Sequence, residues 1–435
     1  ARLSAMGLPG KRDEYWHYTD PAAFNAAQAK PAALGDTGAA LFAGLDAVKL
    51  VFVDGVFDAA ASDDLTLSGV SLSRLASAPA GHWAQTYGAL EAAGQSPIAR
   101  PWAAFNTAFA SDGLLIHVTG KAAKPVSVIY QRRDDSADVV LHHVIKLDAG
   151  AEFTLLEQGP AAARLNHVIE VDLAQGARFH HIRAQGRDLG RHAVTHIFAH
   201  LGAEALFKSF TLTADGALTR NEAVITFAGP DAKAHVAGAA MGDGAFHHDD
   251  TVFVTHAAER CESRQVFKKV LKHGAVGVFQ GKILVKKGAQ KTDGYQISQA
   301  LLLDDNSQFL AKPELEIYAD DVKCSHGSTS GAIDDTALFY LRSVAPKQVK
   351  TSEIYWGAVP FVGLQLLMVA LIIVFPSLIS VGSKIDMKEQ LELNINMQDS
   401  SFGGDTPNLQ FKVEGDDMGE MKLDFPAEGA NKPAK

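Results

Sequence analysis

A two-residue turn motif, Gly or Asp followed by Ala, recurs through the middle of the sequence and constrains the fold more than any other feature. Successive copies start about 14 residues apart, or about twice that, and short strand-like segments fill the gaps. Such regular recurrence is typical of a solenoid, in which each coil covers the apolar face of its neighbour. The copies are Gly150-Ala151, Gly176-Ala177, Gly202-Ala203, Gly216-Ala217, Asp231-Ala232, Gly244-Ala245, Gly274-Ala275 and Gly288-Ala289.

The segments between these turns read as short strands from about Gly113 to about Ile333. They include LLIHV, VSVIY, FTLLE, ARFHHI, AVITFA and VGVFQG. A β-sandwich is the competing interpretation, because its strands also recur, at intervals of about 8–12 residues. The constant turn motif favours the solenoid, so we predict a mainly β protein.

The first part of the chain, residues 1–100, has a different character. It is rich in Ala with Pro and Gly interruptions, and we predict a small α/β region. Short helices are expected around Pro21–Lys30 and Trp83–Ala93, with a strand pair near Val48–Val56. Asp54-Gly55 lies between two apolar runs, which is a hairpin signal. The sequence begins without Met and without an apolar leader, so we expect no secretory signal and further residues upstream.

Charge and cysteine content narrow the functional classes. The formal net charge is −10, which argues against a nucleic-acid-binding protein, because that function needs a basic face. The two cysteines, Cys261 and Cys324, exclude a disulfide framework and fit a reducing compartment. A body in the cytoplasm is therefore expected.

Cys324 and His326 are the foremost candidate site residues. Side chains two apart in a strand point to the same face, so a thiol and an imidazole would lie side by side. Both groups bind soft and borderline metals. The alternative is a buried thiol next to a hydrogen-bonded core histidine.

The sequence around this pair resembles that of a known protein family. IYADDVKCSHGSTSGAIDDTALFYL (317–341) and KKGAQKTDGYQISQALLLDD (286–305), with RDEYWHYTDP near the start, resemble the SufB/SufD scaffold family of the SUF iron–sulfur cluster assembly system. The resemblance covers about residues 12–343 and is closest to SufD members, because SufB members carry an acidic residue where this chain has Gly327. It implies a right-handed parallel β-helix core over residues 101–343.

The resemblance also implies a function. The chain would be a non-catalytic scaffold that pairs with SufB, with Cys324 and His326 at the interface where a cluster is built. A cluster needs about four ligands, so a chain with two thiols would share a transient cluster or iron with its partner. No GxxxxGK[ST] loop is present, so ATP hydrolysis would come from the ATPase SufC. A homodimer is the other assembly to consider.

A second thiol, three histidine pairs and one lysine are further candidates for a functional role. Cys261 lies in a polar stretch beside Arg260 and Arg264, which would lower the thiol pKa, so it is a candidate reactive thiol, although a bystander role is favoured. The pairs His142-His143, His180-His181 and His247-His248 are interpreted as solvated solenoid edge, with weak metal binding by His247–Asp250 as the alternative. Lys269 stands where family members usually have glycine, and we expect it to disturb a tight turn.

The end of the chain departs from the family. Residues 344–383 read as a linker and a candidate transmembrane helix, because Ile354 to Ser383 contain no charged residue. A buried core helix is the alternative. Residues 352–380 resemble the terminal helix of the large permease subunit of TRAP-type dicarboxylate transporters, and residues 384–435 are expected to be disordered. The resemblance implies that SufC docks on the C-terminal helical region of family members. This chain has a different sequence there, so SufC binding is the family property most in doubt.

Two further functions compete with the scaffold. The first is a membrane-tethered hybrid whose end derives from a TRAP permease, with scaffold function lost or altered, a cytoplasmic body and a single C-terminal span. The second is a β-helix enzyme that acts on polysaccharides, which the absence of a signal peptide disfavours.

Overall fold

The computed structural model describes residues 2–35, 41–78, 82–186 and 188–332. These residues lie in one compact unit, Ala1–Ala345. Within them, no helix has both the length and the apolar character that crossing a bilayer requires. The candidate membrane segment Ile354 to Ser383 and the tail 384–435 lie outside the described residues.

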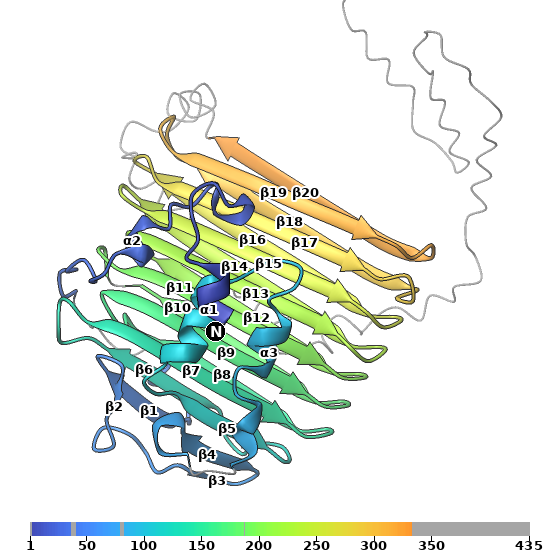
Figure 1. Cartoon of the computed structure of the whole chain (residues 1–435), viewed down its shortest axis with the longest axis horizontal. Coiled ribbons are helices and arrows are strands. Elements are labelled where there is room, and N and C mark those ends of the chain that lie inside the picture. The colour runs from blue at the N-terminus through green and yellow to red at the C-terminus, as the bar shows by residue number, and fades with distance from the viewer. Residues whose placement is uncertain (1, 36–40, 79–81, 187, 333–435) are drawn as a thin grey trace, which may run out of the picture. The chain divides into compact units, whose positions relative to one another are not determined.

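The described residues form a β-solenoid built from two ten-stranded sheets, here called sheet A and sheet B. Their strands stack in order along the solenoid, from β4 near one end to β20 at the other (Figure 1). Sheet A contains β2 (Val56–Phe57), β1 (Val48–Val53), β6 (Val126–Gln131), β8 (Glu152–Gln158), β10 (Arg178–Gln185), β12 (Leu206–Ala214), β14 (Lys233–Asp243), β16 (Glu262–Lys272), β18 (Thr292–Leu302) and β20 (Val322–Ala332). Sheet B contains β3 (Thr66–Leu67), β4 (Val70–Arg74), β5 (Leu114–Val118), β7 (Asp138–Leu147), β9 (Arg164–Leu173), β11 (His192–Leu201), β13 (Leu218–Phe227), β15 (His247–His256), β17 (Val276–Val285) and β19 (Gln308–Ile317).

The repeated turn motif forms the corners of the coils. The first motif residue has a positive φ at six of the eight copies, for example +70° at Gly150 and +61° at Asp231. Glycine and aspartate tolerate this left-handed conformation better than most residues. The alanine that follows is fully buried at Ala151 and Ala232. About 14 residues therefore make one strand and one corner, and two such units make a coil.

Because neighbouring strands pair in parallel and in register, residues of the same type stack on one another along the solenoid. Phe179 of β10 pairs with Phe153 of β8 and with Phe207 of β12. Their rings stack inside the solenoid with centroids 6.1 and 5.8 Å apart. The predicted solenoid is confirmed, and its core is the space between the two sheets.

The N-terminal hairpins close one end of the solenoid. The predicted Asp54-Gly55 hairpin is confirmed, because both residues have positive φ and β1 pairs antiparallel with β2. β1 also pairs in parallel with β6, so it extends sheet A. β4 pairs antiparallel with β5 and extends sheet B.

Short helices cover the outer face of sheet B (Figure 1). The predicted helix around Pro21–Lys30 is shorter than expected, and the one over Trp83–Ala93 is two helices, because Gly88 has a φ of +72° and interrupts it. The helices are α1 (Arg2–Met6), α2 (Ala22–Asn25), α3 (Ala89–Ala93) and α4 (Pro101–Phe109), with the 3-10 turns η1 (Glu14–Trp16), η2 (Leu75–Ser77) and η3 (Trp83–Thr86).

The RDEYW segment fixes this layer to sheet B. Arg220 of β13 and Gln280 of β17 donate hydrogen bonds to the carbonyl oxygen of Tyr15, at 2.8 and 3.1 Å. The hydroxyl of Tyr15 donates to Glu314 of β19, at 2.6 Å. Burial raises the pKa of Tyr15, and the neighbouring carboxylate adds to the shift, so the phenol stays protonated as the donor. Sheet B is thus buried on both faces, whereas the strands of sheet A alternate between buried and accessible residues.

Candidate functional site

The last coil of the solenoid, formed by β19 and β20, has an open end. These strands are the final members of sheets B and A, and no other described strand pairs beyond them (Figure 1). Pro313 lies within β19, opposite Gly281 of β17. Because proline lacks an N–H, it is tolerated in a sheet where that position faces an unpaired edge. β20 contains no proline and offers a continuous backbone edge.

Cys324 and His326 lie on the inner face of β20. Their Cα partners on β18 are Gly294 and Gln296, both buried positions of a strand that alternates strictly. Cys324 packs on the cluster that contains Ile283, which places its side chain toward the core. The prediction that thiol and imidazole share one face is therefore confirmed. His326 is nevertheless exposed and Cys324 is half-buried, because no further described coil covers this face.

The thiol of Cys324 is protonated in this environment. Burial raises its pKa, and the carboxylate of Asp293 adds to this, against a smaller opposing effect of a backbone hydrogen bond from Gly294. A Cβ at position 294 would lie 3.2 Å from Sγ, so glycine there leaves room for the sulfur. Because a thiol must lose its proton to ligate a metal, binding here would release a proton.

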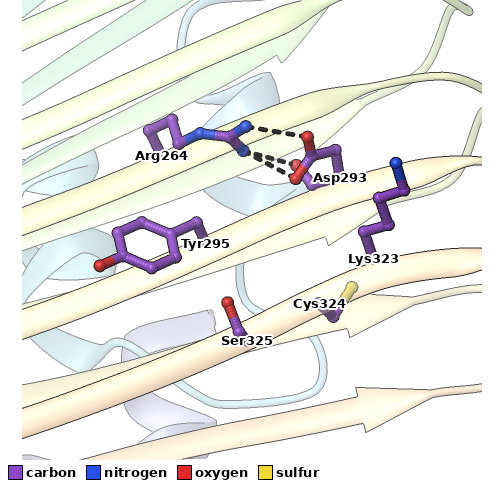
Figure 2. Close-up of a pocket in the computed structure, with 6 residues that line it drawn as sticks. All are labelled: Arg264, Asp293, Tyr295, Lys323, Cys324 and Ser325. Carbon is purple, nitrogen blue, oxygen red and sulfur yellow. Dashed lines mark hydrogen bonds and ion pairs between the residues drawn. The ribbon is translucent and has the colours of Figure 1, made fainter. Parts of the chain in front are cut away.

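An open hollow of about 480 Å³ adjoins Cys324 on the outer face of sheet A. Arg264 forms a bidentate ion pair with Asp293, with N–O distances of 3.0 and 2.9 Å, and Lys323 lies beside them (Figure 2). This paired arginine and the lysine ammonium line the approach to the thiol. The hollow is lined by Arg264, Asp293, Tyr295, Lys323, Cys324 and Ser325.

The lowered thiol pKa expected for Cys261 is wrong, whereas the favoured bystander role agrees with its position. Its side chain is only 1% exposed and donates a hydrogen bond to the carbonyl oxygen of Gly229, at 3.3 Å. Burial raises the pKa of this thiol rather than lowering it. Arg260 lowers this pKa by less than burial raises it, and its guanidinium is paired with carboxylates: Nε and Nη2 donate to Asp231 at 2.8 Å, and Nη1 donates to Glu259 at 2.9 Å. Cys261 lies at a corner of the solenoid, where its small side chain fills the core.

The solvated-edge interpretation of the histidine pairs is wrong for most of these rings, although His180 is exposed. Both rings of His142-His143 are fully buried, and one ring of each other pair, His181 and His248, is 2% exposed. The carboxylates of the run His247–Asp250 are buried as well. Asp249 accepts hydrogen bonds from Thr19 and Arg220, so this carboxylate is committed to protein partners.

Lys269 does not lie in a turn, contrary to the sequence-based expectation. It is an inward-facing residue in the middle of β16, only 2% exposed. Its Nζ lies 2.7 Å from Nδ1 of His248 and forms an ion pair with Asp250, both on β15. The lysine therefore bridges the two sheets inside the solenoid.

A second potential metal-binding group lies deep in the core. Ligand atoms of His143, Glu157 and His167 lie within 4.8 Å of one another, and all three side chains are buried. Most of their polar atoms are already engaged, although Nε2 of His167 has no hydrogen-bond partner among the described residues. The backbone N–H of Leu114 donates to Nδ1 of His143, at 2.9 Å, which places the ring proton of a neutral imidazole on Nε2.

The charge of the group also disfavours a cation. The hydroxyl of Tyr130 donates to Glu157 at 2.6 Å, and the guanidinium of Arg183 donates to the same carboxylate at 2.9 Å. His181 Nε2 lies 2.6 Å from Glu157. An arginine and hydrogen-bond donors thus take the place that a metal ion would occupy. We interpret this cluster as a structural polar core.

The sequence contained a signal for this core that pattern analysis missed. The histidines of VVLHHVI and HVIEV sit in nearly uninterrupted apolar runs, and a strand buried on both faces has no alternation. Reading these runs as doubly buried strands would have placed His142, His143 and His167 inside. The Glu157 cluster and the Cys324–His326 pair are separate, because five strands of sheet A lie between β8 and β20, roughly 29 Å at about 4.8 Å per strand spacing.

Comparison with known proteins identifies the family. Residues 129–345 match the family model described as the SufBD core domain of SUF-system Fe–S cluster assembly. The chain is 31% identical to the iron–sulfur cluster assembly protein SufD of Escherichia coli over 358 residues, which cover 79% of this chain and 81% of that protein. It is 28% identical to the SufBD family protein slr0076 of Synechocystis over 371 residues, 78% of this chain and 80% of that protein. A shorter match, 28% over 181 residues, covers 41% of this chain and 38% of the chloroplastic protein ABCI7 of Arabidopsis thaliana.

The matched region spans the described solenoid from β6 onward and includes β20 with its cysteine and histidine. The chain therefore belongs to the SufB/SufD family of iron–sulfur cluster assembly proteins.

Proposed function

We propose that this chain is a non-catalytic scaffold subunit that pairs with a SufB-type partner through the open end of its solenoid. His326 and Cys324 would contribute to a transient iron or iron–sulfur site shared with that partner. One observation carries the proposal. The only described cysteine–histidine pair on one strand face lies on the terminal strand, where a second subunit can reach both side chains.

Ligand number supports a shared site. A cluster takes about four protein ligands, mostly thiolates. This chain has two cysteines, and the other, Cys261, is buried at a corner of the solenoid with its thiol hydrogen-bonded to a backbone carbonyl. The remaining ligands must come from another molecule. A terminal coil that exposes one thiol and one imidazole fits such a shared site, in which the cluster is cargo.

Backbone geometry supports pairing along β20. An exposed edge strand carries unpaired N–H and C=O groups that a strand of another chain can satisfy. Five residues of β20 at its centre, Ser325 to Thr329, are small or short-chained apart from His326, so a second strand can approach closely. Pro313 makes β19 the poorer edge for the same purpose. The pairing would bring partner ligands next to His326.

The energy source would be external. No phosphate-binding loop of the GxxxxGK[ST] type occurs in the sequence, so we assign ATP hydrolysis to a SufC-type partner. The chain itself would hold and position the cargo.

The test is reconstitution with a SufB-type partner. Complex formation is measured by size-exclusion chromatography, and cluster loading by visible absorbance after anaerobic supply of iron and sulfide. His326→Asn and Cys324→Ser should lower cluster loading while complex formation persists. His273→Asn is the matched control, because His273 is an exposed histidine of the same solenoid and lies at a corner away from β20. The proposal would be refuted if both site variants load clusters fully, or if the unsubstituted chain forms no complex with the SufB-type partner.

A further inference from the structure

We propose that Gln296 is a positioning residue for His326: its side-chain amide holds the imidazole in one tautomer, so that the lone pair of the other ring nitrogen faces the open end of the solenoid. This inference rests on the function proposed above, because it gives His326 the role of ligand. Gln296 belongs to the KTDGYQISQALLLDD segment, which is part of the family resemblance.

The register puts the two side chains next to each other. Gln296 lies at the centre of β18 and is the Cα partner of His326 on β20. Paired residues of adjacent strands are about 4.8 Å apart and present their side chains on the same face. Two neighbours confirm that this face is continuous across the pair of strands. Ser298 donates a hydrogen bond to Ser328 at 3.0 Å, one step further along both strands.

The amide of Gln296 is buried and unpaired. The side chain is 0% exposed, and neither Oε1 nor Nε2 has a hydrogen-bond partner among the described residues. Leaving a buried polar group unsatisfied costs about 1–3 kcal/mol, so a residue of this kind calls for a partner. Among the polar groups on this face, Ser298 and Ser328 bond to each other and Thr292 bonds to a backbone carbonyl. Gln296 has two uncommitted neighbours in the described chain, the imidazole of His326 on β20 and the buried amide of Gln265 on β16, and of these two only His326 is a candidate ligand.

The opposite sheet is shaped to admit the amide. Gly281 of β17 faces Gln296 across the interior, and a Cβ at position 281 would lie 2.4 Å from Oε1. Any larger residue there would displace the amide. Gly281 thus leaves the space that the Gln296 amide occupies inside the last coils.

The chemistry follows from the two ring nitrogens of histidine. A neutral imidazole carries one N–H and one lone pair, and the group that accepts from the N–H fixes which nitrogen remains free. Histidines that ligate metals usually donate their second nitrogen to such an acceptor. The carbonyl of Gln296 would accept from the inward nitrogen of His326. The outward nitrogen would then carry the lone pair toward a shared iron atom.

The test reads the tautomer directly on the full chain. Histidine ring nitrogens are labelled with nitrogen-15, and their chemical shifts report which nitrogen carries the proton; the His326 signal is assigned by its loss in His326→Asn. In the unsubstituted protein we expect one tautomer at neutral pH. Gln296→Leu should give a mixture of both. Gln265→Leu is the matched control, because Gln265 is also fully buried with an unpaired amide and is separated from His326 by β18.

Further outcomes keep the inference separate from the proposed function. If Gln296→Leu does not fold, Gln296→Asn keeps the amide but shortens its reach, and it should give the same tautomer mixture. In complex with the partner, Gln296→Leu should weaken ferrous-ion binding by about 10- to 100-fold, as loss of such supporting groups does. An unchanged tautomer in Gln296→Leu, or an equal change in the Gln265 control, would overturn the inference. A tautomer that depends on Gln296 while His326→Asn loads clusters normally would instead overturn the proposed function alone.

Discussion

Cys324 and Cys261 show how position along the solenoid decides what a thiol can do. Both thiols have a raised pKa caused first by burial. Cys261 sits at an internal corner under neighbouring coils, whereas Cys324 is half-buried on the last described strand, with no further described coil beside it. Only the second can meet a reagent or a partner without unfolding.

We predict that the native protein presents one reactive thiol. A disulfide reagent such as DTNB at neutral pH should modify about one cysteine per chain, and denaturant should expose the second. Reaction should accelerate as the pH rises, because the thiolate is the reactive species. Cys324→Ser should abolish the native reaction and Cys261→Ser should preserve it. Native labelling that survives in Cys324→Ser would contradict the burial of Cys261.

Lys269 carries a second prediction at this scale. Burial raises the pKa of Asp250, and Lys269 opposes that rise through its ion pair. Lys269→Ala leaves a buried carboxylate unpaired and should lower the free energy of unfolding by roughly 3–5 kcal/mol. The adjacent Lys268 is exposed on the outer face, so Lys268→Ala should change the free energy of unfolding by less than about 0.5 kcal/mol. Urea unfolding of both variants makes the comparison, and equal effects would argue against the buried ion pair.

Among the elements, β19 and β20 are the two long strands with one edge unpaired within the described chain, and β20 is the one without a proline. The remaining strands of sheet A each have two neighbours from β1 to β18, which secures their backbone groups. Because β20 contains no proline, its second edge can form backbone hydrogen bonds with a further strand, as its first edge does with β18. A partner strand would convert the open end into an interior position of a longer sheet.

Proline substitutions test that edge. In a parallel sheet, backbone groups of successive residues point to opposite neighbours, so of Gly327→Pro and Ser328→Pro one removes an N–H facing β18 and the other an N–H facing the open edge. We expect one variant to lose stability and the other to stay folded but bind the partner roughly 10-fold more weakly, as loss of a hydrogen bond of about 1 kcal/mol and a poorer fit imply. Binding is measured by titration calorimetry. Pro313→Ala on β19 is the control and should bind normally; two folded proline variants that both bind normally would exclude pairing through β20.

At the scale of the whole molecule, the unusual property is a polar interior. Histidine, glutamate, arginine and lysine side chains bond to one another inside the solenoid, both within sheet A and between the two sheets. Burial lowers the pKa of His143, His196 and His256 to about 4 each. These rings are neutral in the folded protein at neutral pH. Protonating them in place would put charges where water cannot reach.

The pH dependence of stability follows from these three histidines. In the unfolded chain the pKa of each histidine is near the ordinary value of about 6.5. Below that pH the histidines are protonated in the unfolded state but stay neutral in the folded state. Stability should therefore be fully present above about pH 6.5 and decline as the pH falls toward 4, by about 1.4 kcal/mol per histidine per pH unit. Urea midpoints at pH 7.5, 6.0 and 5.0 measure this decline. Equal midpoints at all three pH values would show that the rings are not held neutral.

Local sequence determined much of this protein by itself. The turn spacing predicted the solenoid because a corner in left-handed conformation needs Gly or Asp, and the strand between corners has a fixed length. The Asp54-Gly55 hairpin and the shared face of Cys324 and His326 followed from backbone periodicity alone. These features depend on residues close together in the chain, so they can be read directly from it.

The tertiary structure decided which faces are covered. Sequence patterns placed Cys261 and the paired histidines at the surface, but the N-terminal segment covers sheet B and the coils enclose their own corners. Whether a strand face is buried depends on segments hundreds of residues away, such as Tyr15 against Gln280. The same holds for the candidate site: β20 is the edge strand of sheet A among the described residues, and an alternation of residues carries no information about a strand's place in the stack.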